Sequence, residues 1–240
     1  MIKIENVVTP SSEQWKAVIM GARNPLNSWN RSDTIICEHE LEDWPHDAIK
    51  TFNGLGPNDH DLLMRLCNAG TDHRKFMRMI TVHLDMTAPL YFWKEFDTYK
   101  IGTVANSCST MHKIHSKEFM IEDFSIEHLD DDCMSCEVNG GDHFYPLSSL
   151  DVLKITIDAL NYWRRRYLAT KNKEDWWQMI QLLPTSYNQK RTVMLNYEVL
   201  ANIYKSRKDH KLDCWHTFCD WIKSLPYSEL ITGQSIEEKD

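Results

Sequence analysis

The chain has 240 residues and a formal net charge of −8, with 27 basic residues against 35 acidic ones. Hydrophobic residues make up 42% and charged residues 26%, which is typical of folded globular proteins and excludes wholesale disorder. An acidic chain lacks the broad basic face that sequence-independent binding of duplex nucleic acid requires. We therefore expect no nucleic-acid partner, although a local basic site for a small anion is compatible with this composition.

The sequence carries no sign of a membrane or secretory destination. No apolar stretch approaches the roughly 20 residues that a membrane span requires, and the first residues lack the plan of a signal peptide. Seven cysteines are an odd number without regular spacing, which is typical of a reduced compartment. We expect a cytoplasmic protein that does not bind membranes.

The first third of the chain predicts a strand, a helix and a long turn-rich segment. Residues 1–8 alternate in the manner of a short strand. An amphipathic helix should run through Ile19, with Ser11 as its N-cap. Residues 24–57 contain several Asn, Pro and Gly turn signals, so we expect irregular structure there.

A second helix is predicted from Asn58 to Asn68, with an apolar stripe and Gly70 at its C-terminal end. Residues 76–87 then favour a strand that Pro89 ends. Residues 90–100 favour a third helix, which leads into the loop 101–103.

An acidic insertion is expected at about residues 113–150. Residues 113–145 hold nine acidic residues and only two lysines, which is typical of a solvated segment. Within it lies a Cys133-x-x-Cys136 pair, which His128 and His143 could complete as a zinc site. A structural zinc site needs four ligands at a regular spacing, which this set lacks. We interpret the pair as ordinary loop cysteines and expect no metal.

The remainder of the chain is expected to be helical. Ser148 and Asp151 have the spacing of a capping box that opens the first of these helices. Its apolar face comprises Leu153, Ile157, Leu160 and Leu168. Further helices are predicted at residues 174–183, 189–206 and 212–224, the first of them ended by Pro184. Strands followed by a helical C-terminal half indicate an α+β protein.

Residues 70–112 resemble the central motifs of the flavin-dependent thymidylate synthases. Ala88-Pro89 matches an Ala-Pro of that family, and Lys94-Glu95 then falls on its Arg-Gln. Thr98-Tyr99-Lys100 falls on its Arg-His-Arg, and Thr103 takes a serine position. One extra residue brings Asn106-Ser107-Cys108-Ser109 onto Asn-Glu-x-Ser.

The C-terminal half agrees with the same register. Leu183-Pro184 matches a Leu-Pro at a helix break, and Asn196, Leu200, Asn202 and Arg207 fall on family Asn, Leu, Asn and Arg positions. Ala22-Arg23 resembles an Ala-Arg that follows the first helix. The resemblance covers most of the chain outside residues 113–150. It implies a single domain over residues 1–240, with a small antiparallel sheet packed with helices.

The resemblance also implies a set of site residues. Arg207 would be catalytic, because the family arginine contacts the pyrimidine and polarises its ring. Residues expected to bind the FAD cofactor are His73, Tyr99, Lys100, Asn106, Asn196 and Asn202. Residues expected to bind substrate are Lys94, Glu95, Ser107, Ser109 and Arg207. If the helix at 189–206 extends far enough, Asn196 and Arg207 share one of its faces.

Several charged positions of the family pattern are changed. Thr98 and Lys100 replace two arginines, Tyr99 replaces a histidine, and Ile180 replaces a further arginine. Glu198 reverses the charge of another. Arginine forms a bidentate fork with phosphate that threonine cannot form. Without the resemblance, the asparagines read as exposed helix residues, Arg207 as a helix C-terminal cation, and the serines at 107 and 109 as helix caps.

Two functions follow. The first is an enzyme that methylates C5 of dUMP or a related pyrimidine deoxynucleotide such as dCMP. By resemblance it would use FAD, with methylenetetrahydrofolate and NADPH as co-substrates, and would be a homotetramer because the family assembles its sites from several subunits. The second is a nucleotide-binding protein on the same fold that has lost flavin chemistry, since a fold alone does not fix an activity.

Overall fold

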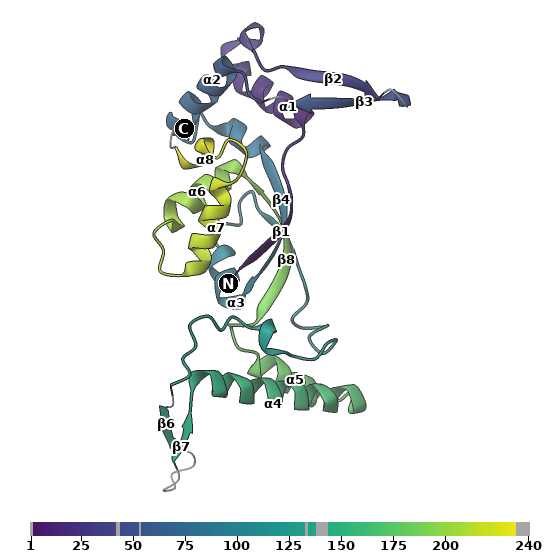
Figure 1. Cartoon of the computed structure of the whole chain (residues 1–240), viewed down its shortest axis with the longest axis vertical. Helices are drawn as coiled ribbons and strands as arrows, with labels where there is room; N and C mark the ends of the chain where they lie inside the picture. Colours follow the sequence, from purple (N-terminus) through teal and green to yellow (C-terminus); the bar gives the residue numbers. More distant parts are fainter. Residues whose placement is uncertain (1, 42–43, 53, 133, 138–143, 234–240) are drawn as a thin grey trace. The chain divides into compact units, whose positions relative to one another are not determined.

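The structure is a computed structural model that describes residues 2–41, 44–52, 54–132, 134–137 and 144–233. The chain divides into two compact units. Unit 1 comprises Met86–Thr98 and Asn106–Arg191 with the first residues of the chain, and unit 2 comprises Ile4–Asp85, Tyr99–Ala105 and the residues from Thr192 on. A four-stranded sheet has the order β1 (Lys3–Val8), β4 (Thr81–Pro89), β8 (Asn188–Asn196) and β5 (Val104–Ser107), and each of these strands has residues in both units. Figure 1 labels the first three of them.

The first two elements are those that the sequence predicts. Strand β1 spans Lys3–Val8, and helix α1 spans Ser12–Arg23. Ser11 forms a capping box with Gln14: its hydroxyl accepts the Gln14 amide, and the Gln14 side chain accepts the Ser11 amide. This exchange satisfies amide groups that the first turn of a helix leaves without partners.

The segment 24–57 contains a hairpin that the sequence analysis missed. Two 3-10 turns, Asn24–Leu26 and Trp29–Arg31, precede antiparallel strands β2 (Ile36–Leu41) and β3 (Trp44–Phe52). Their register pairs Ile36 with Phe52 and shifts after Glu40. The expectation of irregular structure was therefore wrong for the strands, because Pro and charged residues mask a strand that is stabilised mainly by its partner.

Helix α2 spans Pro57–Asn68, close to its predicted bounds, and Gly70 follows its cap with a φ of +97°. The strand predicted over 76–87 begins later than expected. Residues Lys75–Met79 form a 3-10 helix, and β4 runs over Thr81–Pro89, where the proline ends it as predicted. Phe76 and Met77 are buried, so their apolar character reflects core packing rather than strand alternation.

The helix predicted over 189–206 is wrong in its first half. Strand β8 spans Asn188–Asn196, and helix α6 starts only at Tyr197 and ends at Arg207. Burial of Gln189, Val193 and Leu195 follows the two-residue period of a strand. Helix α7 (Asp213–Lys223) confirms the next prediction, while the short α8 (Glu229–Thr232) was not foreseen.

The core of unit 2 is rich in large aromatic side chains. Trp15 of α1 packs edge-to-face against Tyr197 and Tyr227, at ring separations of 6.4 and 5.1 Å. Trp215 and Phe218 of α7 are fully buried. Each such side chain contributes about 1.5–3 kcal/mol through burial, which anchors α6 and α7 to each other.

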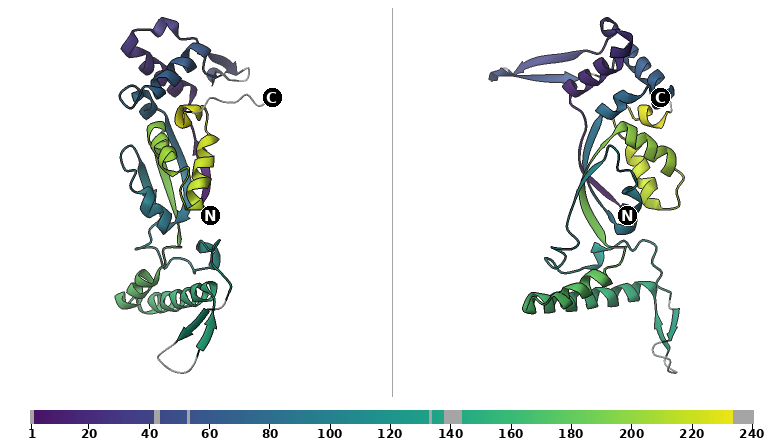
Figure 2. Two further views of the ribbon diagram at one scale, coloured as in Figure 1. Left: turned by 90° about the vertical axis from the view of Figure 1, so that its left-hand side faces the viewer. Right: turned by 180° about the vertical axis from the view of Figure 1, so that it is seen from behind.

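Unit 1 begins with α3, which spans Leu90–Phe96 and is shorter than the predicted helix, since its cap lies at Asp97. The long α4 (Ser149–Thr170) starts at the capping box of Ser148 and Asp151, and α5 (Lys173–Leu182) ends before Pro184, both as predicted. Both Figure 1 and Figure 2 show α5 lying along α4. The last two residues of strand β5 (Val104–Ser107) and the hairpin of β6 (Met134–Glu137) and β7 (Phe144–Leu147) complete the unit.

The segment expected to be a solvated insertion also supplies part of the unit 1 core, so the expectation was wrong for its apolar residues. Ile114, Phe119 and Phe124 are buried in one cluster with the α4 and α5 residues Leu153, Ile157, Leu160 and Met179. Asn161 is buried; its Oδ1 accepts the backbone N–H of Phe119, and its Nδ2 donates to the Phe119 carbonyl oxygen. Leu168, predicted for the apolar face of α4, is exposed instead. The sequence analysis missed these buried apolar residues because the acidic residues around them dominate the composition of the segment.

Two further expectations concern sites and membranes. The question of the Cys133-x-x-Cys136 pair lies outside the described residues, because residues 133 and 143 are not among them. Within the described ranges, no helix combines the length and apolar character needed to cross a bilayer. The α+β class with a small antiparallel sheet is confirmed.

Candidate functional site

The first part of the candidate site is the junction between β8 and α6 in unit 2. Asn196 is the last residue of the strand and the N-cap of the helix, and its Oδ1 accepts the backbone N–H of Val199 at 3.0 Å. Asparagine is among the best N-cap residues because its short side chain reaches this donor. The predicted common helical face of Asn196 and Arg207 is therefore incorrect, because Asn196 precedes the helix.

The loop 99–103 packs against this junction. Gly102 has a φ of +82°, and the Nδ2 of Asn196 approaches its carbonyl oxygen at 3.5 Å. A Cβ at Gly102 would lie 2.7 Å from that nitrogen and 3.0 Å from Val199. Only glycine fits this conformation and this space, so the loop is held at a fixed distance from the start of α6.

Arg207, at the end of α6, is oriented by two aromatic side chains. Its Nε donates to the hydroxyl of Tyr99 at 2.9 Å, and its guanidinium lies 4.9 Å from the ring centre of Trp215. Tyr99 and Trp215 are themselves edge-to-face at 6.1 Å. A cation held over aromatic faces is restricted in its rotamers, so Arg207 presents a preorganised positive charge.

An ion pair lies at the first turn of the same helix, between Glu198 of α6 and Arg74, which is distant in the sequence. Arg74 forms an ion pair with the buried Glu198 at 3.0 Å and donates to Asn202 at 3.3 Å. Glu198 is the residue whose charge is reversed relative to the family pattern. Its carboxylate balances the charge of Arg74, so the pair is electrically neutral.

A thiol next to this pair is unreactive. Burial raises the pKa of Cys67 to about 12, while the opposing charges of Arg74 and Glu198 act on it in opposite directions. Since a thiolate is the nucleophilic form of cysteine, Cys67 is protonated and inert near neutral pH.

The predicted unit 1 residues lie on different elements. Lys94 and Glu95 are on α3, where Lys94 is exposed. Asn106 and Ser107 are exposed in β5. The hydroxyl of Ser109 accepts the amides of Met111 and His112 at 3.3 and 2.8 Å, so it caps a turn and not a helix.

Ser109 also lines a hollow of about 290 Å³ in unit 1. Lys117 lies in the same wall and forms an ion pair with Asp123 at 2.5 Å. That hydrogen bond raises the pKa of Lys117 although partial burial opposes the shift. Lys190 adds a second cation to the lining. This hollow can receive a small polar ligand.

Arg191 is a unit 1 cation that the sequence analysis did not select. Its guanidinium lies 4.2 Å from the ring centre of Trp93, its Nη1 contacts Asp97 at 2.7 Å, and its Nε donates to Gln189 at 3.0 Å. The sequence signal that could have identified it is the two-residue alternation of β8. This alternation places Arg191 on the same face of the strand as the buried Gln189.

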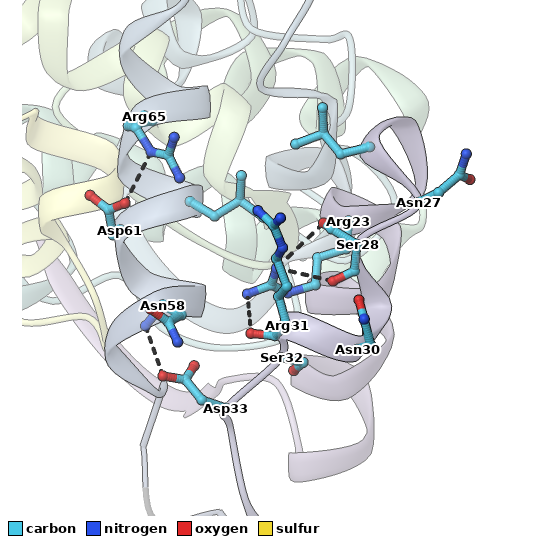
Figure 3. A pocket seen from close by; sticks show the side chains of 12 residues that line it. Arg23, Asn27, Ser28, Asn30, Arg31, Ser32, Asp33, Asn58, Asp61 and Arg65 are labelled. Atoms are coloured by element: carbon cyan, nitrogen blue, oxygen red, sulfur yellow. Dashed lines mark hydrogen bonds and ion pairs between the residues drawn. The ribbon is translucent and has the colours of Figure 1, made fainter.

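A larger polar hollow of about 740 Å³ lies in unit 2 between the end of α1 and the first turns of α2 (Figure 3). Its floor is the buried Arg23, whose Nε donates to Asp59 at 2.6 Å and whose other nitrogens bond the backbone of Ser28 and Arg31. Burial alone would raise the pKa of Asp59, but hydrogen bonds from Thr34, Ser32 and Arg23 lower it. Arg23 thus fixes the loop that follows α1.

The structure groups part of the predicted site. In unit 2 it joins Tyr99 with Arg207 directly, while Asn196 caps the start of α6 and Asn202 lies within the helix one turn after Glu198. Lys100 and His73 are exposed, and they are the sequence neighbours of Tyr99 and Arg74 respectively. Lys94, Glu95, Asn106, Ser107 and Ser109 belong to unit 1. Arg74 and Trp215 were missed, because their partners are distant in the sequence.

The chain is similar in structure to flavin-dependent thymidylate synthases. Thymidylate synthase X from Helicobacter pylori, solved with FAD and dUMP, superposes with a TM-score of 0.61 at 13% identity, over 97% of this chain and 98% of that one. The UMP/dUMP methylase PolB from Streptomyces cacaoi, solved with 5-Br dUMP, gives 0.57 at 15% identity, over 97% and 95%. Neither a family model nor a curated protein matches the sequence.

These likenesses confirm the resemblance at the level of the fold. The chain has the flavin-dependent thymidylate synthase fold over nearly its whole length. Identities of 13–15% carry no information on which ligand or substrate it takes. That question depends on the residues themselves.

Proposed function

We propose that this chain is a pyrimidine-nucleotide methylase that acts at C5 of dUMP or a related nucleotide. The observation that carries the proposal is the orientation of Arg207 by Tyr99 and Trp215. The neighbours of the same fold were solved with dUMP and 5-Br dUMP. A fixed cation beside a pyrimidine favours the negative charge that develops on the ring when C5 becomes nucleophilic.

The donor set of the loop 99–103 fits a phosphate-bearing group. Lys100 is an exposed cation, and the hydroxyl of Thr103 is buried without a hydrogen-bond partner among the described residues. Buried hydroxyls are normally paired, so this one is a candidate ligand contact. Lys100 and Thr103 would hold a phosphate of FAD, with His73, Tyr99, Asn106, Asn196 and Asn202 as further contacts. The flavin would supply the hydride.

The protein's own residues have defined tasks in this proposal. Arg207 binds the pyrimidine and stabilises its charge, while Tyr99 holds the arginine in place. Lys94, Glu95, Ser107 and Ser109 orient the nucleotide by hydrogen bonds. Methylenetetrahydrofolate and NADPH are the proposed co-substrates, and the active assembly is proposed to be a homotetramer, which light scattering on the purified protein tests.

A second function is favoured by one observation. Glu198 stands where the family pattern has an arginine, and its carboxylate also neutralises the charge of Arg74. Weaker attraction for a diphosphate is the expected consequence. This arrangement favours a protein that binds a pyrimidine nucleotide without using flavin.

Absorption spectroscopy separates the two functions. We expect flavin bands at about 450 nm to co-elute with the protein after incubation with FAD. The Arg207→Ala variant should keep the flavin bands and lose turnover of dUMP, because Arg207 is assigned to the pyrimidine. A colourless protein that dUMP still protects against thermal unfolding would contradict the methylase and support the binding protein.

A further inference from the structure

A hollow of about 280 Å³ lies in unit 1, where α4 ends and α5 begins. Its walls are His112, Tyr167, Lys171, Lys173 and Trp176. Two aromatic rings, an imidazole and two lysines therefore share one cavity. None of these residues is among those assigned above to the cofactor or the substrate.

The aromatic walls are held in fixed orientations. The indole Nε1 of Trp176 donates to the carbonyl oxygen of Met111 at 3.0 Å, and its ring is edge-to-face with Trp177 at 4.8 Å. Tyr167 contacts the imidazole of His115 at 4.9 Å, with the ring planes at 66°. Preorganised rings of this kind stack on planar ligands with little loss of side-chain entropy.

One cation of the hollow occupies an unusual backbone position. Lys171 follows α4 with a φ of +57°, in the left-handed region that glycine or asparagine normally occupies at a helix end. Its ammonium lies 5.7 Å from the ring centre of Tyr167. The contact with the ring holds the Lys171 ammonium at the wall of the hollow.

Other positive charges surround the same walls. Arg164, one helical turn before Tyr167, donates to the carbonyl of His115 at 3.0 Å. Burial and the charges of Lys171, Lys113 and Arg164 lower the pKa of His115. The nearby carboxylate of Asp175 is already engaged by Arg166 and Thr170. A positive region thus exists on a chain whose net charge is −8.

We propose that this hollow binds a nucleoside phosphate, with the base against Trp176 and the phosphate between Lys171 and Lys173. A planar ring beside an anion is the ligand chemistry that aromatic walls and adjacent lysines select. The cavity has room for about one nucleotide. That nucleotide can be free or can belong to a single strand, because both sources present the same base and phosphate.

Quenching of tryptophan fluorescence in the full-length protein tests the proposal, with dTMP and the octamer (dT)8 as probes at low salt. We expect saturable quenching by at least one probe. The double variant Lys171→Asn, Lys173→Gln should weaken binding about tenfold, since each lost phosphate contact is charge-assisted. Asparagine tolerates the left-handed backbone, so this variant should fold. The control variant Lys154→Gln, Lys223→Gln removes two charges elsewhere and should bind within about twofold of the unmodified protein.

A third variant tests the base contact. Because this variant removes the indole that reports binding, its affinities are measured by equilibrium dialysis. Trp176→Leu should weaken the binding of dTMP more than the binding of inorganic phosphate, because only the nucleotide has a ring to stack. Much tighter binding of (dT)8 than of dTMP identifies a single strand as the source, and equal affinities identify a free nucleotide. The proposal is wrong if neither probe quenches saturably, or if the double lysine variant binds as the unmodified protein does.

The proposal does not depend on the methylase activity. The Arg207→Ala variant should lose turnover and keep the quenching, so failure of one proposal is distinguishable from failure of the other. If the double lysine variant changes the oligomeric state without changing nucleotide binding, the hollow is a subunit contact, and the nucleotide proposal is overturned.

Discussion

Replacing Gly102 by alanine should destabilise the protein because the loop 99–103 is packed directly against the start of α6. The alanine would keep a φ near +82°, which costs about 1–2 kcal/mol for a residue with a Cβ. Its Cβ would also lie 2.7 Å from the Nδ2 of Asn196, so the Asn196 side chain must move. Loss of that N-cap costs about 1 kcal/mol more. The expected total is about 2–3 kcal/mol.

Gly70 provides a matched control. It has a φ of +97°, and nothing lies within 4 Å of the position that its Cβ would take. Gly70→Ala should therefore cost only the backbone term of about 1–2 kcal/mol. Urea unfolding followed by circular dichroism gives both free energies of unfolding.

A double-mutant cycle isolates the contact itself. In an Asn196→Ala background, the partner that collides with the new Cβ is absent, so Gly102→Ala should cost less than it does alone. Equal costs of Gly102→Ala and Gly70→Ala, or a cost of Gly102→Ala that Asn196→Ala leaves unchanged, would refute the steric reasoning.

Three other changes have defined outcomes. Asp59→Asn should cost about 3–5 kcal/mol in urea unfolding, because it leaves the buried Arg23 without its carboxylate. The folded-state pKa of Asp59 is lowered, so its contribution to stability is present above about pH 4 and is lost as the pH falls through the folded pKa. The Asp59→Asn variant should show a flatter dependence of stability on acid pH, and an unchanged slope would count against the assignment. Arg207→Ala should lower turnover of dUMP about 10²-fold in steady-state kinetics, whereas a variant with unaltered turnover would exclude Arg207 from the chemistry. Glu198→Gln should cost about 1–3 kcal/mol and strengthen FAD binding in equilibrium dialysis, because the charge of Arg74 is then no longer balanced; weaker binding would oppose this account.

Local sequence signals predicted those elements that local interactions determine. Ser11 as an N-cap and the capping box of Ser148 with Asp151 depend on residues close in sequence, and both form as predicted. Strand β8 was mistaken for a helix because the apolar residues around Val193 and Leu195 continue into α6, whose first turn is fully buried. The hairpin of β2 and β3 depends on pairing between strands, which a reading of single segments does not detect.

The candidate site shows the same division. The resemblance to the family placed Tyr99 and Arg207 in one site, and the structure brings the Tyr99 hydroxyl and the Arg207 Nε to 2.9 Å. The partners Arg74 and Trp215 could not be predicted, because no periodicity links residue 74 with Glu198 or residue 215 with Tyr99. The buried hydroxyl of Thr103 also depends on tertiary packing.

Release of tritium from [5-³H]dUMP tests the central claim most directly, because replacement of the hydrogen at C5 is the step that defines the proposed methylase. The assay contains the purified protein with FAD, NADPH and methylenetetrahydrofolate, and Arg207→Ala is its control. The account predicts that tritium enters water with the unmodified protein and that release falls about 10²-fold in the variant. Absence of tritium release from dUMP and from the corresponding dCMP, with flavin demonstrably bound, would contradict it.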